Sequence, residues 1–272
     1  MSLNSRTSVG CRACREPGIA PEFTMAFQPI LDSDSGAIYA HEALVRPVGG
    51  GSAYEVLGQI TDENRYAFDQ ACRVKAISLA AELGMRSLLN INFLPNAVYQ
   101  PAACIRATLE AAARTGFPVT QIVFEVTEDE RSRDAKHLMA IFNEYKRHGM
   151  RTAIDDFGAG HSGLNLLAQF QPDIVKIDMA LTREIHTDRV RRTITRSIAQ
   201  MCAQLGITVI AEGIESFDEA LCLRDLGIHL LQGYYFARPQ LEALPPIAHE
   251  AFDALRGAFD AHAYKAVPFV AR

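Results

Sequence analysis

The sequence predicts an α/β protein built as a barrel of parallel strands surrounded by helices. Short apolar segments typical of buried strands alternate with segments of helical periodicity, and most of the helical segments stop at a glycine. About seven or eight such units follow one another, and the length of 272 residues is close to that of one such barrel, which typically has about 250 residues. An open, doubly wound sheet is the alternative arrangement for the same pattern.

The chain opens with two strands that differ from the rest. Residues 23–30 and 36–46 have strand patterns, and the turn-forming segment Asp-Ser-Asp-Ser-Gly at 32–36 joins them. A turn this short connects antiparallel neighbours, whereas parallel strands need a long crossover. We therefore expect the first strand to run against the others.

Helices and strands then alternate. Gly84, Gly116, Gly149, Gly206 and Gly227 mark helix ends, because glycine readily adopts the left-handed conformation that terminates many helices. The segment QIVFEVT at 121–127 is typical of a buried strand. The expected helices are 64–83, 102–115, 134–148, 188–205, 217–226 and 244–259, and the expected strands after the opening pair are 87–93, 121–127, 151–154, 173–177, 207–211 and 229–231.

One domain is expected over residues 22–256, between a flexible N-terminal tail at 1–21 and a C-terminal tail at 257–272. The N-terminal tail contains a CxxC pair, Cys11 and Cys14. A structural zinc site needs four ligands and no second pair supplies them, so half of a zinc site, a redox pair and a plain tail with two thiols all remain open. The other four cysteines are isolated and resemble small buried hydrophobes.

Composition excludes several classes of function. The net charge is −5, and there is no block of Lys and Arg, so the chain is not expected to bind a nucleic-acid polymer, whose affinity comes mainly from neutralised phosphates. No apolar run approaches the roughly 18 residues of a membrane span, and residues 1–21 lack the apolar core of a secretory signal. We expect no membrane association and a cytoplasmic protein.

Polar residues gather where the predicted strands end, and these ends converge on one face of a parallel barrel. At least five carboxylates would meet there, and two unit charges about 4 Å apart repel by roughly 4 kcal/mol at an effective dielectric near 20. Such a cluster needs cations, and its oxygen ligands suit Mg²⁺ or Mn²⁺. One such Asp alone is often only a helix cap, but the recurrence from strand to strand favours a site. Its members are Glu42, Asn92, Glu125, Glu128, Asp155, Asp156, Lys176, Asp178, Glu212, Glu215 and Gln232.

Two shorter motifs in the same region are rejected. Residues 158–163 match the GxGxxG of dinucleotide-binding folds, with Asp178 twenty residues past the first glycine. The match lies in the middle of the chain, however, and Asp155 and Asp156 just before it would repel a pyrophosphate. Residues 156–158 match the DFG of kinases, but the HRD motif and the strand lysine that a kinase needs are absent.

Eight segments taken together and in order resemble the EAL domain. The resemblance covers nearly the whole chain after residue 22. The segments are FQPI (27–30), EALVR (42–46), NINFLP (90–95), FEVTE (124–128), DDFGAGHSGL (155–164), DIVKID (173–178), AEGIE (211–215) and QGYYFARP (232–239).

The resemblance implies a TIM-like (β/α)₈ barrel with an antiparallel first strand, and a phosphodiesterase that hydrolyses cyclic di-GMP to linear pGpG with two Mg²⁺ or Mn²⁺ ions. It also implies a homodimer. The implied roles are metal binding for Glu42, Asn92, Glu125, Asp155, Asp156 and Glu212, catalysis for Lys176, Glu212 and Glu42, substrate contacts for Gln28, Arg46, Asp178 and Gln232, and support of the ligands for Glu128 and Glu215.

The sequence departs from the commonest pattern of the family at Pro47, which often is Trp, and in the loop with His161 and Gly163. These positions affect the substrate rim and the loop but remove no ligand. A catalytically silent receptor for cyclic di-GMP and a protein-interaction module without nucleotide are the alternatives. The complete set of expected ligands, with Lys176 and Arg46, weighs against both.

Overall fold

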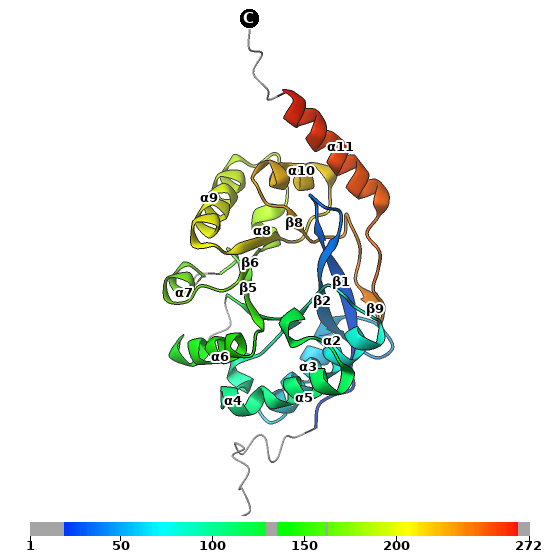
Figure 1. Cartoon of the computed structure of the whole chain (residues 1–272), viewed down its shortest axis with the longest axis vertical. Coiled ribbons are helices and arrows are strands. Elements are labelled where there is room, and N and C mark those ends of the chain that lie inside the picture. The colour runs from blue at the N-terminus through cyan, green and yellow to red at the C-terminus, as the bar shows by residue number, and fades with distance from the viewer. Residues whose placement is uncertain (1–18, 129–134, 161–162, 266–272) are drawn as a thin grey trace, which may run out of the picture.

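The computed structural model describes residues 19–128, 135–160 and 163–265. Its strands form a closed barrel of eight, β1 to β8, around which the helices lie (Figure 1). The strands are β1 (Thr24–Asp32), β2 (Ile38–Arg46), β3 (Leu88–Asn92), β4 (Ile122–Thr127), β5 (Arg151–Phe157), β6 (Ile174–Ile177), β7 (Thr208–Ala211) and β8 (Leu230–Leu231), and a short β9 (Gln240–Leu241) pairs antiparallel with β1 at Ala26 and Phe27. The predicted barrel is confirmed.

The first strand runs against its neighbours, as the short turn predicted. β1 pairs antiparallel with both β2 and β8, while β2 to β8 pair in parallel. Arg224 and His229 both contact Asp34 in the β1–β2 turn, at 2.9 and 3.1 Å. The turn therefore lies at the end of the barrel where the parallel strands begin.

The helices agree with the predicted segments except in detail. They are α2 (Ala53–Leu57), α3 (Arg65–Glu82), α4 (Pro101–Cys104), α5 (Arg106–Thr115), α6 (Ala135–Arg147), α7 (Gly163–Gln169), α8 (Met179–Thr182), α9 (Arg189–Leu205), α10 (Phe217–Asp225) and α11 (His249–Lys265). The segment predicted as one helix at 102–115 is divided at Ile105. Short elements such as α2, α8 and β9 were not predicted, because they have too few residues for a periodic pattern.

The last helix was predicted five residues too early. It begins at His249 and not at residue 244, and it ends at Lys265 and not at residue 259, so it continues past the expected domain boundary at 256. Pro245 and Pro246 explain the late start, since proline has no N–H to donate and disfavours the helical conformation in the residue before it. Within the described residues, no helix is both long enough and apolar enough to cross a membrane.

The interior of the barrel is layered. One layer of apolar side chains takes one residue from each of the eight strands, namely Ile30, Ala40, Leu88, Val123, Ala153, Ile174, Ile210 and Leu230. Successive side chains of a strand point to opposite faces, so the residue two positions further on returns to the interior. Moving two positions toward the C-terminal ends of the parallel strands replaces this apolar layer by a polar one.

Candidate metal and catalytic site

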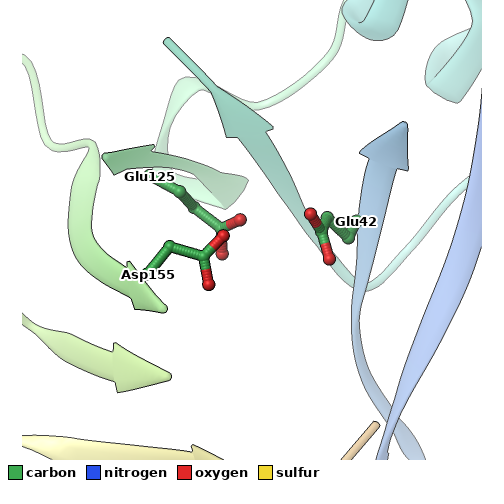
Figure 2. Close-up of side chains that lie close together, drawn as sticks. All are labelled: Glu42, Glu125 and Asp155. Carbon is green, nitrogen blue, oxygen red and sulfur yellow. The ribbon is translucent and has the colours of Figure 1, made fainter. Parts of the chain in front are cut away.

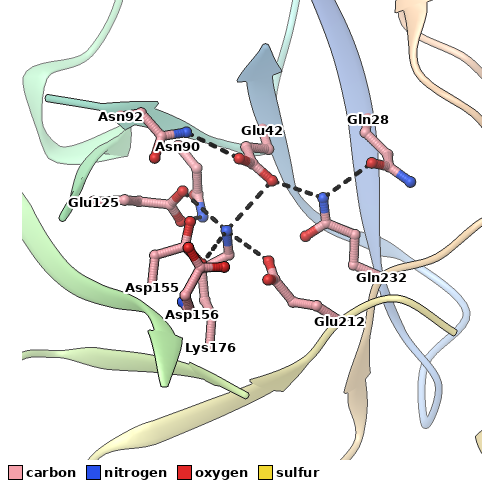
Figure 3. Close-up of polar contacts among 10 residues, drawn as sticks. All are labelled: Gln28, Glu42, Asn90, Asn92, Glu125, Asp155, Asp156, Lys176, Glu212 and Gln232. Carbon is pink, nitrogen blue, oxygen red and sulfur yellow. Dashed lines mark hydrogen bonds and ion pairs between the residues drawn. The ribbon is translucent and has the colours of Figure 1, made fainter. Parts of the chain in front are cut away.

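The polar layer directly above the apolar one contains eight residues, again one from each strand or from the position next to its end. They are Gln28, Glu42, Asn90, Glu125, Asp155, Lys176, Glu212 and Gln232. All except Glu212 are buried. Side chains from strands far apart in the sequence thus meet in the barrel, as Figure 3 shows.

Lys176 is the central residue of this layer. Its ammonium Nζ lies 2.6 Å from Glu212 Oε1, 3.0 Å from Glu125 Oε2, 3.1 Å from Asp155 Oδ1 and 3.3 Å from Glu42 Oε2. The side chain is fully buried. Burial alone would lower the pKa of Lys176, but the surrounding carboxylates outweigh it and raise the pKa well above its ordinary value. Lys176 is therefore a permanent positive charge at the centre of the site.

The carboxylates around Lys176 carry more negative charge than one ammonium can balance. Burial, together with charge repulsion from neighbouring carboxylates, raises the pKa of Glu125 and Glu212 well above the ordinary value, and the pKa of Asp155 is also raised. Glu42 differs, because Lys176 and the amides of Gln232 and Asn92 outweigh its burial and lower its pKa. The excess negative charge is the electrostatic condition under which a cation binds.

The geometry fits two divalent cations. One group of carboxylates, Glu42, Glu125 and Asp155, and a second, Asp155, Asp156 and Glu212, each offer three oxygens within 4.8 Å of one another, and Asp155 belongs to both. Figure 2 shows the first group, with the three carboxylates approaching from separate strands. Two buried amide oxygens nearby, Asn90 Oδ1 and Gln232 Oε1, have no hydrogen-bond donor among the described residues. An all-oxygen set of this kind suits Mg²⁺ or Mn²⁺.

Asp156 reaches the site through an unusual backbone conformation. Its φ is 53°, in the left-handed region that a non-glycine residue seldom adopts, and its N–H donates to Asp155 Oδ1 at 3.0 Å. The pairing of β5 with β6 is irregular between Ile154 and Phe157. Burial and repulsion by Asp155 and Asp178 raise the pKa of Asp156 to about 6. The irregularity lets two consecutive aspartates serve one site, although a regular strand would point them to opposite faces.

Two glutamines join the first strand to the carboxylates of the polar layer. Gln232 Nε2 donates to Glu42 Oε2 at 2.8 Å and to Gln28 Oε1 at 3.3 Å, and Gln28 Nε2 donates to the Ala237 carbonyl at 3.1 Å. A cavity of about 230 Å³ opens beside them, with Glu212, Glu215 and Tyr234 also in its lining. Both predicted glutamines thus border a cavity next to the carboxylates.

Asn92 and Arg46 lie on the other side of Glu42. Asn92 Nδ2 donates to Glu42 Oε1 at 2.9 Å, and its side chain is exposed. Arg46 ends β2, and together with Asn92 it lines a second cavity of about 290 Å³. Its guanidinium donates to the Val45 carbonyl at 2.7 Å, which leaves further N–H groups for a ligand.

Glu128 holds the loop that follows β5. Its two carboxylate oxygens accept the N–H groups of Gly158 and Gly163, at 2.8 and 2.6 Å. Gly163 has no room for a side chain, because an added Cβ would lie 2.6 Å from Phe157 Cε2 and 2.9 Å from Glu128 Cδ. The loop that carries the glycines of the rejected GxGxxG motif is thus anchored by a carboxylate beside the site.

The remaining two predicted residues have local roles in the structure. Asp178 caps α8, accepting the Ala180 N–H at 2.8 Å, and it faces Asp156 closely enough to raise the pKa of that carboxyl. Glu215 forms a two-point ion pair with Arg183, one contact of which is 2.8 Å long. Glu215 contacts none of the metal-ligand candidates through these bonds, but it fixes the loop after β7 to the loop after β6.

Sequence reasoning missed three residues that shape the site. Asn90 donates from its buried amide to Glu125 Oε1. Glu219 accepts the N–H groups of Glu184, Glu215 and Ser216 at 2.8, 2.9 and 3.1 Å, and so ties together the loops after β6 and β7. Asp69 accepts the Leu94 N–H just after β3 at 2.9 Å. Asn90 could have been found from its alternation with Asn92, but Glu219 and Asp69 lie in helices and carried no signal.

Some predicted features lie outside the described residues. These are the CxxC pair Cys11 and Cys14, His161 in the loop, and the end of the C-terminal tail from residue 266. Of the other four cysteines, Cys72, Cys104 and Cys202 are buried, as expected for small hydrophobic side chains, and Cys222 is half-buried.

Comparisons with known proteins identify the family of the chain. The profile of the EAL domain matches residues 13–239. Among curated relatives, the chain is 33% identical over 225 residues to the blue light- and temperature-regulated antirepressor BluF of Escherichia coli, covering 82% of this chain and 56% of BluF. It is 30% identical over 228 residues to the probable cyclic di-GMP phosphodiesterase PdeD of the same organism, covering 80% and 42%. The chain thus spans about half the length of these two relatives.

Solved structures give the same result. A standalone versatile EAL protein from Vibrio cholerae, solved in its c-di-GMP-bound form, is 52% identical with a TM-score of 0.83, covering 86% of this chain and 99% of that one. BlrP1 of Klebsiella pneumoniae, solved as a manganese and cyclic di-GMP complex, is 37% identical with a TM-score of 0.77, covering 81% and 56%. With the profile matching most of the chain and the strand-end residues meeting in one barrel, this protein belongs to the EAL domain family.

Proposed function

We propose that the chain is a cyclic di-GMP phosphodiesterase that hydrolyses its substrate to linear pGpG with two Mg²⁺ or Mn²⁺ ions. The proposal depends on one observation. Two sets of three carboxylate residues have Asp155 in common, and Lys176 lies at their centre. The names of PdeD, of the c-di-GMP-bound Vibrio cholerae protein and of the manganese complex of BlrP1 support the same substrate and the same kind of ion.

The proposed metal ligands divide into two sets. Glu42, Asn92, Glu125 and Asp155 would hold one ion, and Asp155, Asp156 and Glu212 the other. When bound, the two cations supply positive charge against the phosphate oxygens and acidify water. Asn90 and Gln232 hold Glu125 and Glu42 by hydrogen bonds, which fixes the orientation of the ligands before any ion arrives.

The chain itself supplies the groups that bind and orient the reacting atoms. Hydrolysis adds water across one P–O ester bond, so that one phosphate stays on the 5′ oxygen and the 3′ oxygen leaves with a proton. Glu212 is placed to accept the proton of the attacking water, because it is only half-buried and lines the cavity beside the other carboxylates. Lys176 stabilises the negative charge that develops on the phosphoryl oxygens. Arg46, with its free N–H groups, and Gln28 are proposed to bind the substrate.

A second candidate function is a cyclic di-GMP receptor without turnover. Lys176 contacts four carboxylates at 2.6 to 3.3 Å. These ion pairs would stabilise the site even when no metal ion is bound. Similarity to BluF, which is named as an antirepressor, supports the same possibility of a regulatory protein. The excess of carboxylates over Lys176 favours the enzyme.

The purified chain should be incubated with cyclic di-GMP and Mn²⁺, Mg²⁺ or EDTA, and the products separated by chromatography over time. The phosphodiesterase gives pGpG with either metal and none with EDTA. Nucleotide binding in a parallel titration without any product identifies the receptor. Absence of both binding and product contradicts both candidates.

We also propose that the chain acts as a homodimer through the face beside the β5 loop. A groove of about 570 Å³ lies between this loop and α9. Leu164 and Ile194 in its lining are 64% and 42% exposed, so they offer apolar surface that a second chain could cover. Light scattering after size exclusion should give twice the mass of 29.9 kDa, and Leu164→Glu should return it to that of one chain.

A further inference from the structure

A buried ion pair on α3 lies directly behind two of the proposed metal ligands. Arg73 Nη2 and Asp69 Oδ2 are 2.8 Å apart, one helical turn from each other, and both side chains are completely buried. α3 packs against β1 and β3 on the outside of the barrel. No carboxylate of the metal site contacts this pair, so it forms a separate charged unit.

Asp69 holds the segment that follows β3. Its Oδ1 accepts the N–H of Leu94 at 2.9 Å, two residues beyond Asn92. On the opposite side of this segment, the N–H of Phe93 donates to the carbonyl of Glu125 at 3.0 Å. The backbone directly after Asn92 is therefore fixed between a carboxylate of α3 and the backbone of a second ligand.

Arg73 contacts the neighbours of both ligands in sequence. Its guanidinium carbon lies 4.7 Å from the ring centre of Phe124 and 5.6 Å from those of Phe93 and Tyr145. Phe124 precedes Glu125, and Phe93 follows Asn92. A cation packed among aromatic rings is stabilised by their negative faces, which favours one place for the guanidinium and hence for Asp69.

Stability alone does not account for this pair. Burying two charges costs solvation energy, and apolar residues of similar volume often replace a buried ion pair without loss of stability. Apolar residues could not, however, accept the N–H of Leu94. We propose that Asp69, held in place by Arg73, is a positioning residue that sets the place of Asn92 and thereby the geometry of the first metal position. This inference rests on the proposed function, since it assigns Asn92 to the metal.

Two double variants separate positioning from stability. Asp69→Leu with Arg73→Met removes the charges and the acceptor of the Leu94 N–H. Asp69→Asn with Arg73→Gln also removes the charges but keeps an acceptor. Asp34→Asn is the control, because it weakens an ion pair with Arg224 at the far end of the barrel. Each variant is titrated with Mn²⁺ alone, followed by electron paramagnetic resonance, and its unfolding midpoint in EDTA is measured.

The apolar variant should bind Mn²⁺ about tenfold more weakly, near the lower end of the 10–100-fold range typical for residues that orient metal ligands. The polar variant should stay within about threefold of the unmodified chain, and the control should be unchanged. Equal Mn²⁺ affinity in the two double variants overturns the inference. A loss of Mn²⁺ affinity that merely parallels the loss of stability, measured by the unfolding midpoints, also overturns it.

Hydrogen exchange distinguishes this inference from the proposed function. If the unmodified chain binds no Mn²⁺, the proposed function fails, whereas the positioning of the segment is still measured by deuterium uptake over residues 92–95. The apolar variant should exchange there at least tenfold faster than the polar variant. Equal uptake in the two variants contradicts the role of Asp69.

Discussion

Lys176 Nζ lies 2.6 Å from Glu212 Oε1, the shortest of its four carboxylate contacts. The two residues come from neighbouring parallel strands, since Lys176 is paired in register with Ile210, two residues before Glu212. The group proposed to accept a proton is therefore next to a permanent positive charge. This arrangement leads to the first prediction.

Lys176→Met should reduce turnover of cyclic di-GMP by at least about 10² to 10³, the usual cost of losing one charge that stabilises the transition state, while substrate binding persists. It should also lower the unfolding midpoint in EDTA, because the carboxylates lose the one buried cation that contacts them among the described residues, and Mn²⁺ should restore much of that loss. Kinetics, nucleotide titration and thermal unfolding measure the three effects. Lys146→Met, at a half-exposed position, is the control, and unchanged turnover in Lys176→Met refutes the role of the ammonium.

Asp155→Ala should abolish turnover and remove both metal positions, because both carboxylate groups include this residue. The number of Mn²⁺ ions bound per chain, measured by calorimetric titration, should fall from two to fewer than one at concentrations that saturate the unmodified chain. Asp253→Ala, at an exposed position of α11, should behave as the unmodified chain. Full activity in Asp155→Ala would refute the two-ion arrangement.

Gly163→Ala should disturb the loop that Glu128 anchors, because the added methyl group meets Phe157 and Glu128 at distances that no real contact tolerates. We expect turnover to fall at least tenfold, and the unfolding free energy to fall by about 1–3 kcal/mol, as for other overpacked sites. Gly257→Ala is the matched control, since its Cβ meets nothing within 4 Å. Equal effects of the two substitutions contradict the anchored loop.

His41 should make the metal-free fold sensitive to acid. It is buried, its Nε2 has no partner among the described residues, and burial lowers its pKa to about 4. Because the folded pKa lies below the unfolded value near 6.5, the unfolded chain binds the extra proton, so stability is present above pH 6.5 and is lost as the pH falls toward 4.

The contribution between pH 7.5 and pH 5 should be about 2 kcal/mol, from about 1.4 kcal/mol per pH unit below 6.5. The free energy of unfolding is measured in EDTA at the two pH values, for the unmodified chain and for His41→Gln. The difference between the two chains isolates the contribution of His41, because the carboxylates titrate in the same way in both chains. A stability difference between the two chains that does not change with pH shows that the pKa of His41 is the same in the folded and the unfolded chain, and it contradicts the prediction.

The sequence predicted the barrel because its strongest signals are local. Apolar strands, helix-ending glycines and the turn at 32–36 each depend on a few neighbouring residues, and the parallel arrangement then brings the strand ends together. Seven of the eight residues of the polar layer were named without any structure, and alternation along β3 would have added Asn90.

What escaped prediction depends on contacts between distant elements. Asp69 and Glu219 lie in helices, where a carboxylate usually faces water, and only the packed barrel turns them toward the loops that they hold. The conformation of Asp156 also requires the irregular pairing of β5 with β6, which no local pattern encodes. The divided helix at Ile105 and the late start of α11 are similar cases of local geometry within an otherwise correct element.

The reversed direction of β1 decides on which side the chain enters the barrel. Thr24, the first residue of β1, is paired with Arg46, the last residue of β2, at the rim where the candidate metal ligands lie. In a barrel whose strands all run one way, the first strand would start at the opposite rim. A domain fused ahead of β1 would therefore join the polypeptide at the rim of the candidate site, next to Arg46, and not at the opposite end of the barrel.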